Sequence, residues 1–289
     1  MCDCSGFINQ SSFTMQQLVL ETFAGISMLG IGFKEQGFCV VSSGDTILGN
    51  HHDIRNFHAV AGKFDGVIGG SPCQNFSKLN RNPDKAKGIE LMNEFKRIVI
   101  ESGCSWFLLE NVPESPDISI DGYAVQRFML NAKHCGSNQN RNRKFQFGSK
   151  EGFFLHIQRD SSPINVSSCL TASEGKNTDR RTWEDFCELQ GLPRDFDLPE
   201  FTLSGAYRAV GNGVNVHVSR VIARAIREAT EGNLQGLITD FKFCICGCGE
   251  TISTSRTHYN ASCRKRMQVR RDTSSVNKPG TVTRAESQT

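Results

Sequence analysis

The sequence lacks the features that mark membrane-spanning and secreted proteins. No apolar run approaches the roughly 20 residues that a membrane-spanning helix needs, and the N-terminus has no basic stretch followed by an apolar one. The net charge is only +3, so the overall charge does not indicate a class of partner. No internal repeat is present. We therefore expect a cytoplasmic globular protein that does not contact a membrane.

Cysteine, by contrast, is abundant, with 12 residues in a chain of 289. A chain of this length can bury one substantial core and still have a small appendage, and it shows no export signal, so a disulfide framework is not expected. Its 38% hydrophobic and 22% charged residues are those of an ordinary globular protein. We expect the cysteines to divide among buried positions, a nucleophile and metal ligands.

Short apolar runs alternate with amphipathic segments along the chain. The predicted strands are Leu18–Leu20, Phe38–Ser42, Phe64–Ile68 and Ser105–Leu109. Five helices are predicted. One ends at Gln36, two cover Lys85–Ser102 and Asp121–Lys133, one begins at a capping box that starts with Thr182, and the last runs from about Asn215 to Ala229. This alternation predicts an α/β fold with a mostly parallel sheet and helices on both faces.

Distinctive residues follow the predicted strands. They are Phe23-Ala24-Gly25, Asp45, Pro72-Cys73-Gln74 and Glu110-Asn111-Val112. Right-handed crossovers place the carboxyl ends of parallel strands at one edge of the sheet, where ligands bind in such folds. We therefore expect these four segments to meet in one site.

Cys73 is the candidate nucleophile. A cysteine at a strand end is usually a small core residue, but Cys73 lies in a polar turn after Gly69-Gly70, and Pro72 stiffens that turn. Such a position suits a thiolate that must reach a substrate.

Glu110 and three polar residues further along are candidates for acid and electrostatic roles. A glutamate after a buried strand often caps a helix or pairs with an arginine; the alternative is a desolvated carboxyl with a raised pKa that can donate a proton to a ring nitrogen. Gln139, Arg141 and Arg143 alternate as in a strand, which puts all three on one face. They could be solvated, or they could hold a base carbonyl or a phosphate.

Together these segments resemble the DNA cytosine-5 methyltransferase family, in family order from roughly Leu18 to Ile226. The matching segments are Phe23-Ala24-Gly25, Pro72-Cys73-Gln74, Glu110-Asn111-Val112, Gln139-Asn140-Arg141-Asn142-Arg143, Leu189-Gln190-Gly191-Leu192-Pro193 and Gly211-Asn212-Gly213-Val214. Each is weak alone, but six in the family's order are highly specific. The resemblance implies a Rossmann-like fold that uses S-adenosylmethionine, in a compact enzyme of phage or bacterial type that acts on double-stranded DNA, either at the nucleoid or in the cytoplasm of a phage host.

The resemblance also implies roles for single residues. Cys73 adds to carbon 6 of a flipped-out cytosine, Glu110 protonates ring nitrogen 3, and Arg141 neutralises charge on the base oxygen, with Arg143 and Gln139 in support. Gln74 is expected to contact DNA. The expected cofactor-binding residues are Phe23, Ala24, Gly25, Asp45, Asp53, Ile54, Pro72, Asn212 and Val214. One departure stands out: Ser27-Met28 replaces the family's Gly-Gly, which we expect to tighten the cofactor loop.

The expected domain organisation has seven parts. They are a flexible arm (1–15), the catalytic domain (16–148), a very small target-recognition region (149–204), a C-terminal helix that completes the catalytic domain (205–230), a linker (231–240), a zinc-finger-like basic module (241–271) and a disordered tail (272–289). We expect Lys176, Arg180 and Arg181 of the recognition region to lie near phosphates. The chain is expected to be a monomer.

The C-terminal module combines closely spaced thiols with basic residues. The candidate ligands of a structural zinc ion are Cys244, Cys246, Cys248, His258 and Cys263, of which Cys244 and His258 compete for the fourth place. A unit of about 30 residues is too small for a core of its own, so a metal would supply its folding energy. Arg264, Lys265 and Arg266 belong to a basic run that would add salt-sensitive DNA affinity; a solvated basic helix or a metal-free tail is the alternative.

Two other functions remain open from the sequence. The same catalytic set would serve a methyltransferase that acts on cytosine in RNA. A DNA-binding regulator built on an inactive methyltransferase fold is the other, and Ser27-Met28 is the feature that favours it.

Overall fold

The computed structural model describes residues 16–77, 80, 82–161 and 163–231, together with the backbone of two short strands at 241–243 and 251–253. The predictions for the N-terminal arm, for most of the linker and for the tail lie outside these residues. So do the predicted zinc ligands Cys244, Cys246, Cys248, His258 and Cys263, and the predicted DNA contacts Arg264, Lys265 and Arg266.

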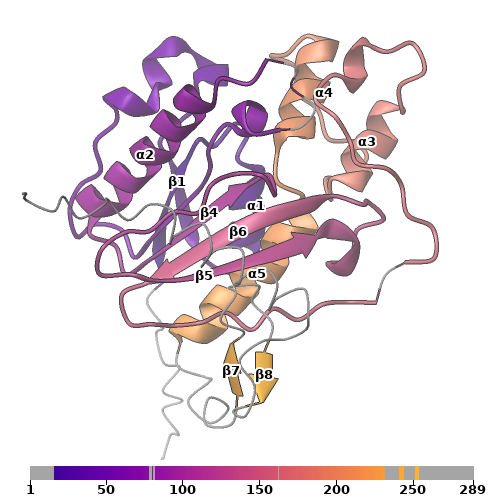
Figure 1. Cartoon of the computed structure of the whole chain (residues 1–289). Helices are drawn as coiled ribbons and strands as arrows, with labels where there is room; N and C mark the ends of the chain where they lie inside the picture. Colours follow the sequence, from indigo (N-terminus) through magenta and orange to yellow (C-terminus); the bar gives the residue numbers. More distant parts are fainter. Residues whose placement is uncertain are drawn as a thin grey trace, which may run out of the picture.

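The described core is built on a six-stranded mixed sheet with the order β2-β1-β3-β4-β6-β5 (Figure 1). The strands are β1 (Leu18–Thr22), β2 (Cys39–Ser42), β3 (Gly66–Gly70), β4 (Trp106–Asn111), β5 (Ala124–Asn131) and β6 (Asn142–Ser149). The first four are parallel, whereas β6 runs antiparallel to both β4 and β5. A separate antiparallel pair joins β7 (Phe241–Phe243) to β8 (Thr251–Ser253). The predicted α/β fold with a mostly parallel sheet is confirmed.

Helices cover both faces of this sheet. They are α1 (Met28–Glu35), α2 (Lys85–Ser102), α3 (Trp183–Leu189), α4 (Leu203–Asn212) and α5 (Val216–Thr230). In β4, Phe107 and Leu109 belong to the apolar cluster under α2, while Trp106 and Leu108 belong to the cluster under α1 and α5. This alternation follows from the two-residue period of a strand, which lets both faces be buried.

A third apolar cluster joins α3 and α4 to the start of α1. Phe186, Tyr207 and Val210 pack there with Met28. The capping box predicted at Thr182 is confirmed, since the Thr182 hydroxyl accepts a hydrogen bond from the Asp185 amide at 3.2 Å. The cluster holds α3 and α4 against the start of α1.

The segment predicted as a single C-terminal helix contains two helices. α4 ends at Asn212, and α5 begins after Asn215, whose side chain accepts a hydrogen bond from the His217 amide at 3.0 Å. The break at 213–215 lets the end of α4 face the carboxyl ends of the strands while α5 packs beneath the sheet.

The helix predicted over Asp121–Lys133 is wrong, because this segment contains the strand β5. Gln126, Phe128 and Leu130 are buried and alternate with more exposed neighbours. Their period is two, as in a strand with one buried face, and β5 pairs with β6 along its full length.

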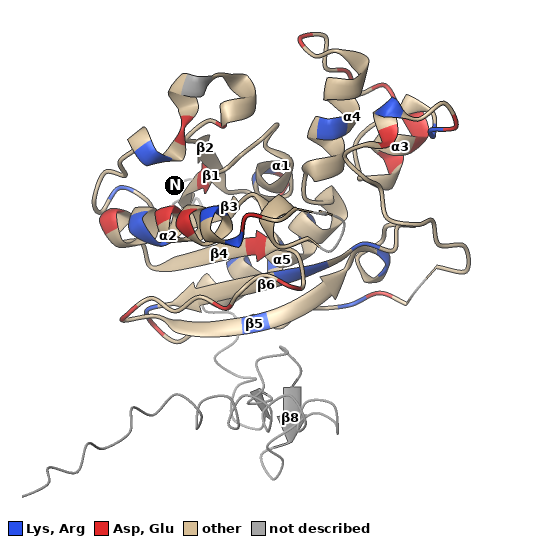
Figure 2. Cartoon of the chain, turned by 45° about the horizontal axis from the view of Figure 1, so that its top comes forward, with Lys and Arg blue, Asp and Glu red and all other residues tan. Residues whose placement is uncertain are grey.

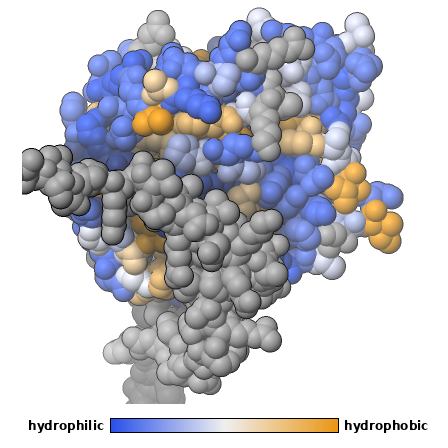
Figure 3. Space-filling view, in the orientation of Figure 1, coloured by the Kyte–Doolittle hydropathy of each residue, from blue (hydrophilic) through white to orange (hydrophobic). Residues whose placement is uncertain are grey.

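Among the described residues, the helices are too short or too polar to cross a membrane. The face shown in Figure 3 is mostly hydrophilic, and its apolar surface gathers in a band between the upper helices and the sheet below. Acidic and basic positions are interspersed over the described part of the chain (Figure 2).

Candidate active site

The carboxyl ends of the parallel strands surround a cavity of about 400 Å³. Its wall combines the β1–α1 turn, the residues after β2 and β3, the end of β4 and the end of α4. Ten predicted site residues line it: Phe23, Ala24, Gly25, Asp45, Pro72, Cys73, Gln74, Glu110, Asn212 and Val214. The expectation that the strand-end segments meet in one site is met by this geometry.

Cys73 opens a short 3₁₀ turn directly after β3. Pro72 precedes it, and the Cys73 carbonyl accepts hydrogen bonds from the amides of Phe76 and Ser77, both at 3.0 Å. The side chain is partly exposed at the cavity. Burial and the nearby carboxyl of Glu110 raise the pKa of the Cys73 thiol, while Arg143 and Arg141 oppose that rise. Burial therefore favours the protonated form of this thiol.

Glu110 lies near the end of β4, opposite Gly70 of β3 in the sheet. It is 7% exposed, and burial raises the pKa of its carboxyl, opposed by Arg143 and Arg141. A Cβ on Gly70 would lie 2.9 Å from Glu110 Oε2, so the absence of a side chain at position 70 makes room for the carboxyl. The site thus holds a carboxyl group whose pKa is raised by burial, which favours its protonated form.

The two arginines of the predicted motif have different surroundings. Arg143 Nε lies 3.1 Å from Glu110 Oε1 in a partly buried ion pair. Figure 2 shows the acidic end of β4 beside the basic start of β6. Arg141 instead donates to the carbonyls of Gly211 at 2.9 Å, Gly213 at 3.0 Å and Leu170 at 3.2 Å. Arg143, and not Arg141, is thus the arginine in contact with the catalytic carboxyl.

Arg141 acts as a cap for the carboxyl end of α4. Its side chain is buried, and burial, followed by the charge of Arg143, lowers the pKa of its guanidinium. The negative end of the helix dipole and three carbonyls compensate the buried charge. Gln139, also fully buried, donates to the Leu189 carbonyl at 2.9 Å and to Gln190 Oε1 at 3.0 Å. Gln139, Arg141 and Arg143 are all absent from the wall of the cavity, and their expected roles toward a substrate stay predictions.

The turn between β1 and α1 adopts left-handed backbone at three positions. Phe23, Gly25 and Ser27 have φ values of 51°, 54° and 59°. A residue other than glycine loses on the order of 1 kcal/mol in this region, so Ser27 keeps the backbone shape of the family's glycine at some cost. Asp45 holds the turn, because its carboxylate accepts from the Gly25 amide and the Ile47 amide, both at 3.0 Å.

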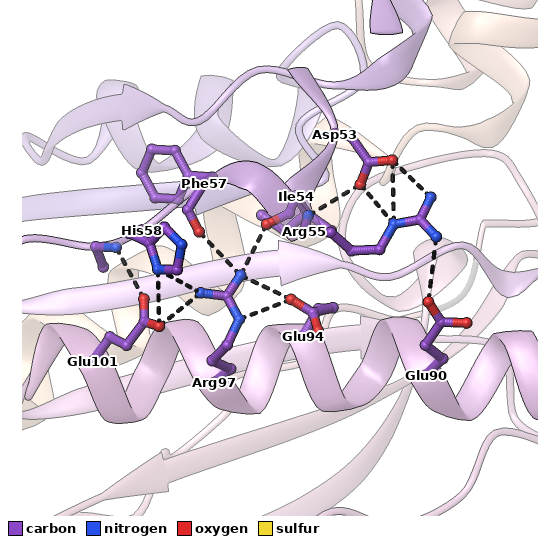
Figure 4. A network of polar contacts seen from close by, with 10 residues as sticks. Asp53, Ile54, Arg55, Phe57, His58, Glu90, Glu94, Arg97 and Glu101 are labelled. Carbon is purple, nitrogen blue, oxygen red and sulfur yellow. Dashed lines mark hydrogen bonds and ion pairs between the residues drawn. The ribbon is translucent and has the colours of Figure 1, made fainter. Parts of the chain in front are cut away.

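Two predicted cofactor residues, Asp53 and Ile54, do not line the cavity. Asp53 pairs with Arg55 at 2.6 Å, which lowers the pKa of Asp53 to about 2, and Ile54 is buried in the cluster under α2. Figure 4 shows that Arg97 of α2 donates to the Ile54 carbonyl at 2.9 Å and to the Phe57 carbonyl at 3.0 Å. These contacts fix the loop after β2 to α2, and the expectation that Asp53 and Ile54 bind the cofactor stays a prediction.

Glu21 and Arg208 line the cavity but were not predicted as site residues. Glu21 of β1 is 1% exposed; its Oε1 accepts from the Gly30 amide at 2.9 Å, and its Oε2 has no hydrogen-bond partner among the described residues. Burial raises the pKa of Glu21 to about 7. The available signal was an acidic residue inside an otherwise apolar strand. Arg208 of α4 gave no such signal, because an exposed arginine on a helix is ordinary.

Comparison with known proteins agrees with this site. Residues 18–178, more than half of the chain, match the model of the family described as C-5 cytosine-specific DNA methylase. The chain is 26% identical over 260 residues to the type II methyltransferase M.HgiDI of Herpetosiphon aurantiacus, covering 78% of this chain and 84% of that protein. It is 25% identical over 232 residues to M.HindV of Haemophilus influenzae, covering 68% and 76%.

Solved structures of methyltransferases show the same fold. EhMeth of Entamoeba histolytica superposes with a TM-score of 0.58 at 14% identity, covering 74% of this chain and 98% of that one. The Dnmt2 methyltransferase of S. pombe gives a TM-score of 0.53 at 14% identity, covering 75% and 99%.

The chain belongs to the C-5 cytosine-specific DNA methylase family. It is a DNA cytosine-5 methyltransferase, like the type II modification methyltransferases to which it is similar. S-adenosylmethionine is the cofactor that membership of this family implies, and DNA is the implied substrate.

Proposed function

We propose that the enzyme methylates carbon 5 of a cytosine flipped out of double-stranded DNA, through a covalent bond between Cys73 and carbon 6. The observation that supports this most strongly is that Cys73 and Glu110 line the same cavity, with Arg143 bound to Glu110 at 3.1 Å. A nucleophile, an acid and a cation thus lie together at one edge of the sheet, beside a space of cofactor size.

Each of these three residues has a task that its surroundings support. Addition of the Cys73 thiolate to carbon 6 pushes electrons toward ring nitrogen 3, where the buried Glu110 supplies a proton. Arg143 stabilises the negative charge that Glu110 then acquires. Carbon 5 becomes an enamine carbon and takes the methyl group. A base then removes the carbon 5 proton, elimination returns the electron pair to Cys73, and ring nitrogen 3 gives its proton back to Glu110.

The cavity residues fit the cofactor that the family implies. When bound, S-adenosylmethionine supplies a methyl group on a sulfonium centre. Asp45 suits the ribose hydroxyls, Phe23 and Ala24 offer apolar contact, and Asn212 and Val214 close the far wall. The unpartnered Oε2 of Glu21 suits the ammonium group. The volume of about 400 Å³ agrees with a ligand of this size.

Covalent trapping tests this proposal. The full chain is incubated with cofactor and duplex DNA that contains 5-fluorocytosine, and the adduct is mapped by peptide mass spectrometry. We expect an adduct on Cys73, loss of the adduct in Cys73→Ala, and its persistence in the matched control Cys39→Ala, since Cys39 lies exposed on β2 outside the cavity. An adduct on another residue would overturn the assignment. Trapping with RNA in place of DNA would select the RNA alternative.

We further propose residues 149–204 as a very small target-recognition region. Gln74 is exposed at the cavity and suits a contact with the DNA around the flipped base. Arg181 is bound by Glu174 at 2.7 Å, and the Arg180 guanidinium lies 6.0 Å from the centroid of the Tyr207 ring, so a phosphate would compete with these contacts. Lys176, at the end of a 3₁₀ turn, stays a candidate for a phosphate contact.

The C-terminal module remains a proposal as a structural zinc unit with basic residues that add DNA affinity. It is supported by the spacing of Cys246, Cys248 and Cys263, with Cys244 or His258 as the fourth ligand, and by the antiparallel pairing of β7 with β8, which flank the first three cysteines in the sequence. Elemental analysis of the purified chain should give one zinc per molecule, reduced in Cys246→Ala. Removal of residues 241–289 should flatten the salt dependence of DNA binding; an unchanged slope would refute this role.

The assembly and location follow the same proposal. We expect a monomer, and an enzyme related to bacterial modification methyltransferases works where the DNA is, in the cytoplasm. Sedimentation of the full chain with and without duplex DNA tests the first point.

A further inference from the structure

The cavity has an excess of acidic side chains. Glu21, Asp45 and Glu110 line it, and Arg208 is the single basic side chain among the described residues of its wall. A cofactor with a sulfonium, an ammonium and a carboxylate can place its two cations near acids, but its carboxylate needs a cation or it loses its hydration without compensation. The wall therefore requires one positive group, and Arg208 provides one.

The position of Arg208 on α4 directs it toward the cavity. Arg208 and Asn212 are four residues apart and both line the cavity, so they share one face of the helix. The opposite face, with Tyr207 and Val210, packs into the apolar cluster beside α3. The guanidinium is thus presented on the face that the core does not use.

Arg208 is also available to a ligand, unlike the other arginines near the site. Its side chain is exposed, and none of the described residues makes a hydrogen bond or an ion pair with it. Arg141 is occupied by three carbonyls and Arg143 by Glu110. A free guanidinium can bind a carboxylate through two parallel hydrogen bonds.

The order of the strands indicates which end of the cofactor lies near Arg208. Asp45 follows β2 at one side of the cavity, and Cys73 and Glu110 follow β3 and β4 at the other. If the ribose of the ligand lies at Asp45 and its methyl group points toward Cys73, only the amino-acid tail remains to be placed. The wall formed by α4 contacts neither the ribose nor the methyl group, so the tail lies against α4.

We propose that Arg208 binds the carboxylate of the methionine part of the cofactor and thereby makes the cavity selective for ligands with that amino-acid tail. This inference rests on the proposed function, in that it places the cofactor in the same cavity. It adds a specificity-determining residue outside the segments that predicted the site.

Two ligands distinguish the contribution of the amino-acid tail to binding from that of the rest of the cofactor. S-adenosylhomocysteine has the carboxylate, and 5′-methylthioadenosine keeps the nucleoside and the sulfur but lacks the tail. Calorimetric titration of the full chain with each ligand gives two dissociation constants. We expect Arg208→Gln to weaken the binding of S-adenosylhomocysteine by about 10- to 100-fold. The dissociation constant of 5′-methylthioadenosine should change by no more than about twofold. Arg208→Lys should restore part of the lost affinity for S-adenosylhomocysteine.

The matched control is Arg224→Gln, because Arg224 is an exposed arginine on α5 outside the cavity. It should change neither constant. An equal loss for both ligands in Arg208→Gln, unchanged binding of S-adenosylhomocysteine, or a wild type that does not prefer it over 5′-methylthioadenosine would each overturn the inference. So would a loss of DNA affinity alone, which would make Arg208 a phosphate contact. If the wild type binds neither ligand, the cofactor assignment of the proposed function fails as well.

Discussion

Met28 and Gly213 touch across the boundary between the first and the last segment of the site. A Cβ on Gly213 would lie 2.2 Å from the sulfur of Met28, which is 1% exposed. Met28, which stands where the family has a glycine, therefore occupies the space that a side chain at position 213 would need, and Gly213 leaves that space open.

Gly213→Ala should for this reason destabilise the protein by about 1 to 3 kcal/mol and weaken cofactor binding, because the buried Met28 must move. Adding Met28→Ala should recover most of the loss, since it removes the clashing atoms. Urea unfolding of the four proteins of this double-mutant cycle gives the coupling energy. Strictly additive effects would show that the contact does not matter.

Glu110→Gln should lower single-turnover methylation by about 10²- to 10³-fold and change the shape of the pH profile. The active wild-type form holds one proton between Cys73 and Glu110, whose pKa values are both raised by burial. Activity should therefore rise with pH as the pair loses its first proton, and fall at high pH as it loses the second. The glutamine variant needs only the thiolate, so its low activity should keep rising with pH. A wild-type rate that shows no decline at high pH would contradict this shared-proton account.

Substitution of Arg141 should mainly lower the stability of the protein, whereas substitution of Arg143 should mainly lower its activity. Arg141→Met removes the buried guanidinium that donates to the carbonyls of Leu170, Gly211 and Gly213 and should cost about 3 kcal/mol of unfolding free energy or more. Arg143→Leu should leave the unfolding free energy closer to that of the wild type but reduce the rate of methylation about 10²-fold, because Glu110 loses its cation. Chemical denaturation and single-turnover rates on the same samples check both. The reverse pattern would restore Arg141 as the residue that faces the base.

Glu21 should make the stability of the free enzyme depend on pH. Its pKa is raised from 4.5 to about 7, so the folded state binds more protons than the unfolded state between these values, and stability falls as the pH rises through that window. Glu21→Gln removes this penalty. We expect the variant to match the wild type near pH 4.5 and to exceed it by about 3 kcal/mol above pH 7. A difference between the two proteins that does not change with pH would disprove the shift.

The sequence predicted those parts of the site that local signals define. Cys73 and Glu110 were found because each follows a short apolar run, and parallel topology then places both at one edge. The choice between Arg141 and Arg143 could not be made in this way, since the carbonyls that occupy Arg141 lie up to 72 residues away in the chain. The ion pair between Asp53 and Arg55 is a contact that a motif comparison does not consider, and the assignment of Asp53 to the cofactor stays a prediction. The strand β5 was read as a helix because its buried face contains the polar Gln126 and its other face contains Val125 and Met129, which obscures the alternation of apolar and polar residues.

The acid and its cation are located on two adjacent strands, whereas the nucleophile is located on a turn. Glu110 pairs with Phe145 in the ladder between β4 and β6, only two positions from Arg143. Backbone ladders hold the proton donor and the positive charge at a fixed separation before any nucleic acid arrives. The sulfur of Cys73 and its short turn are then the part that adjusts to an incoming pyrimidine. Substitutions in that turn should therefore change the rate at which the bond to the base forms and leave the pair of Glu110 and Arg143 unchanged.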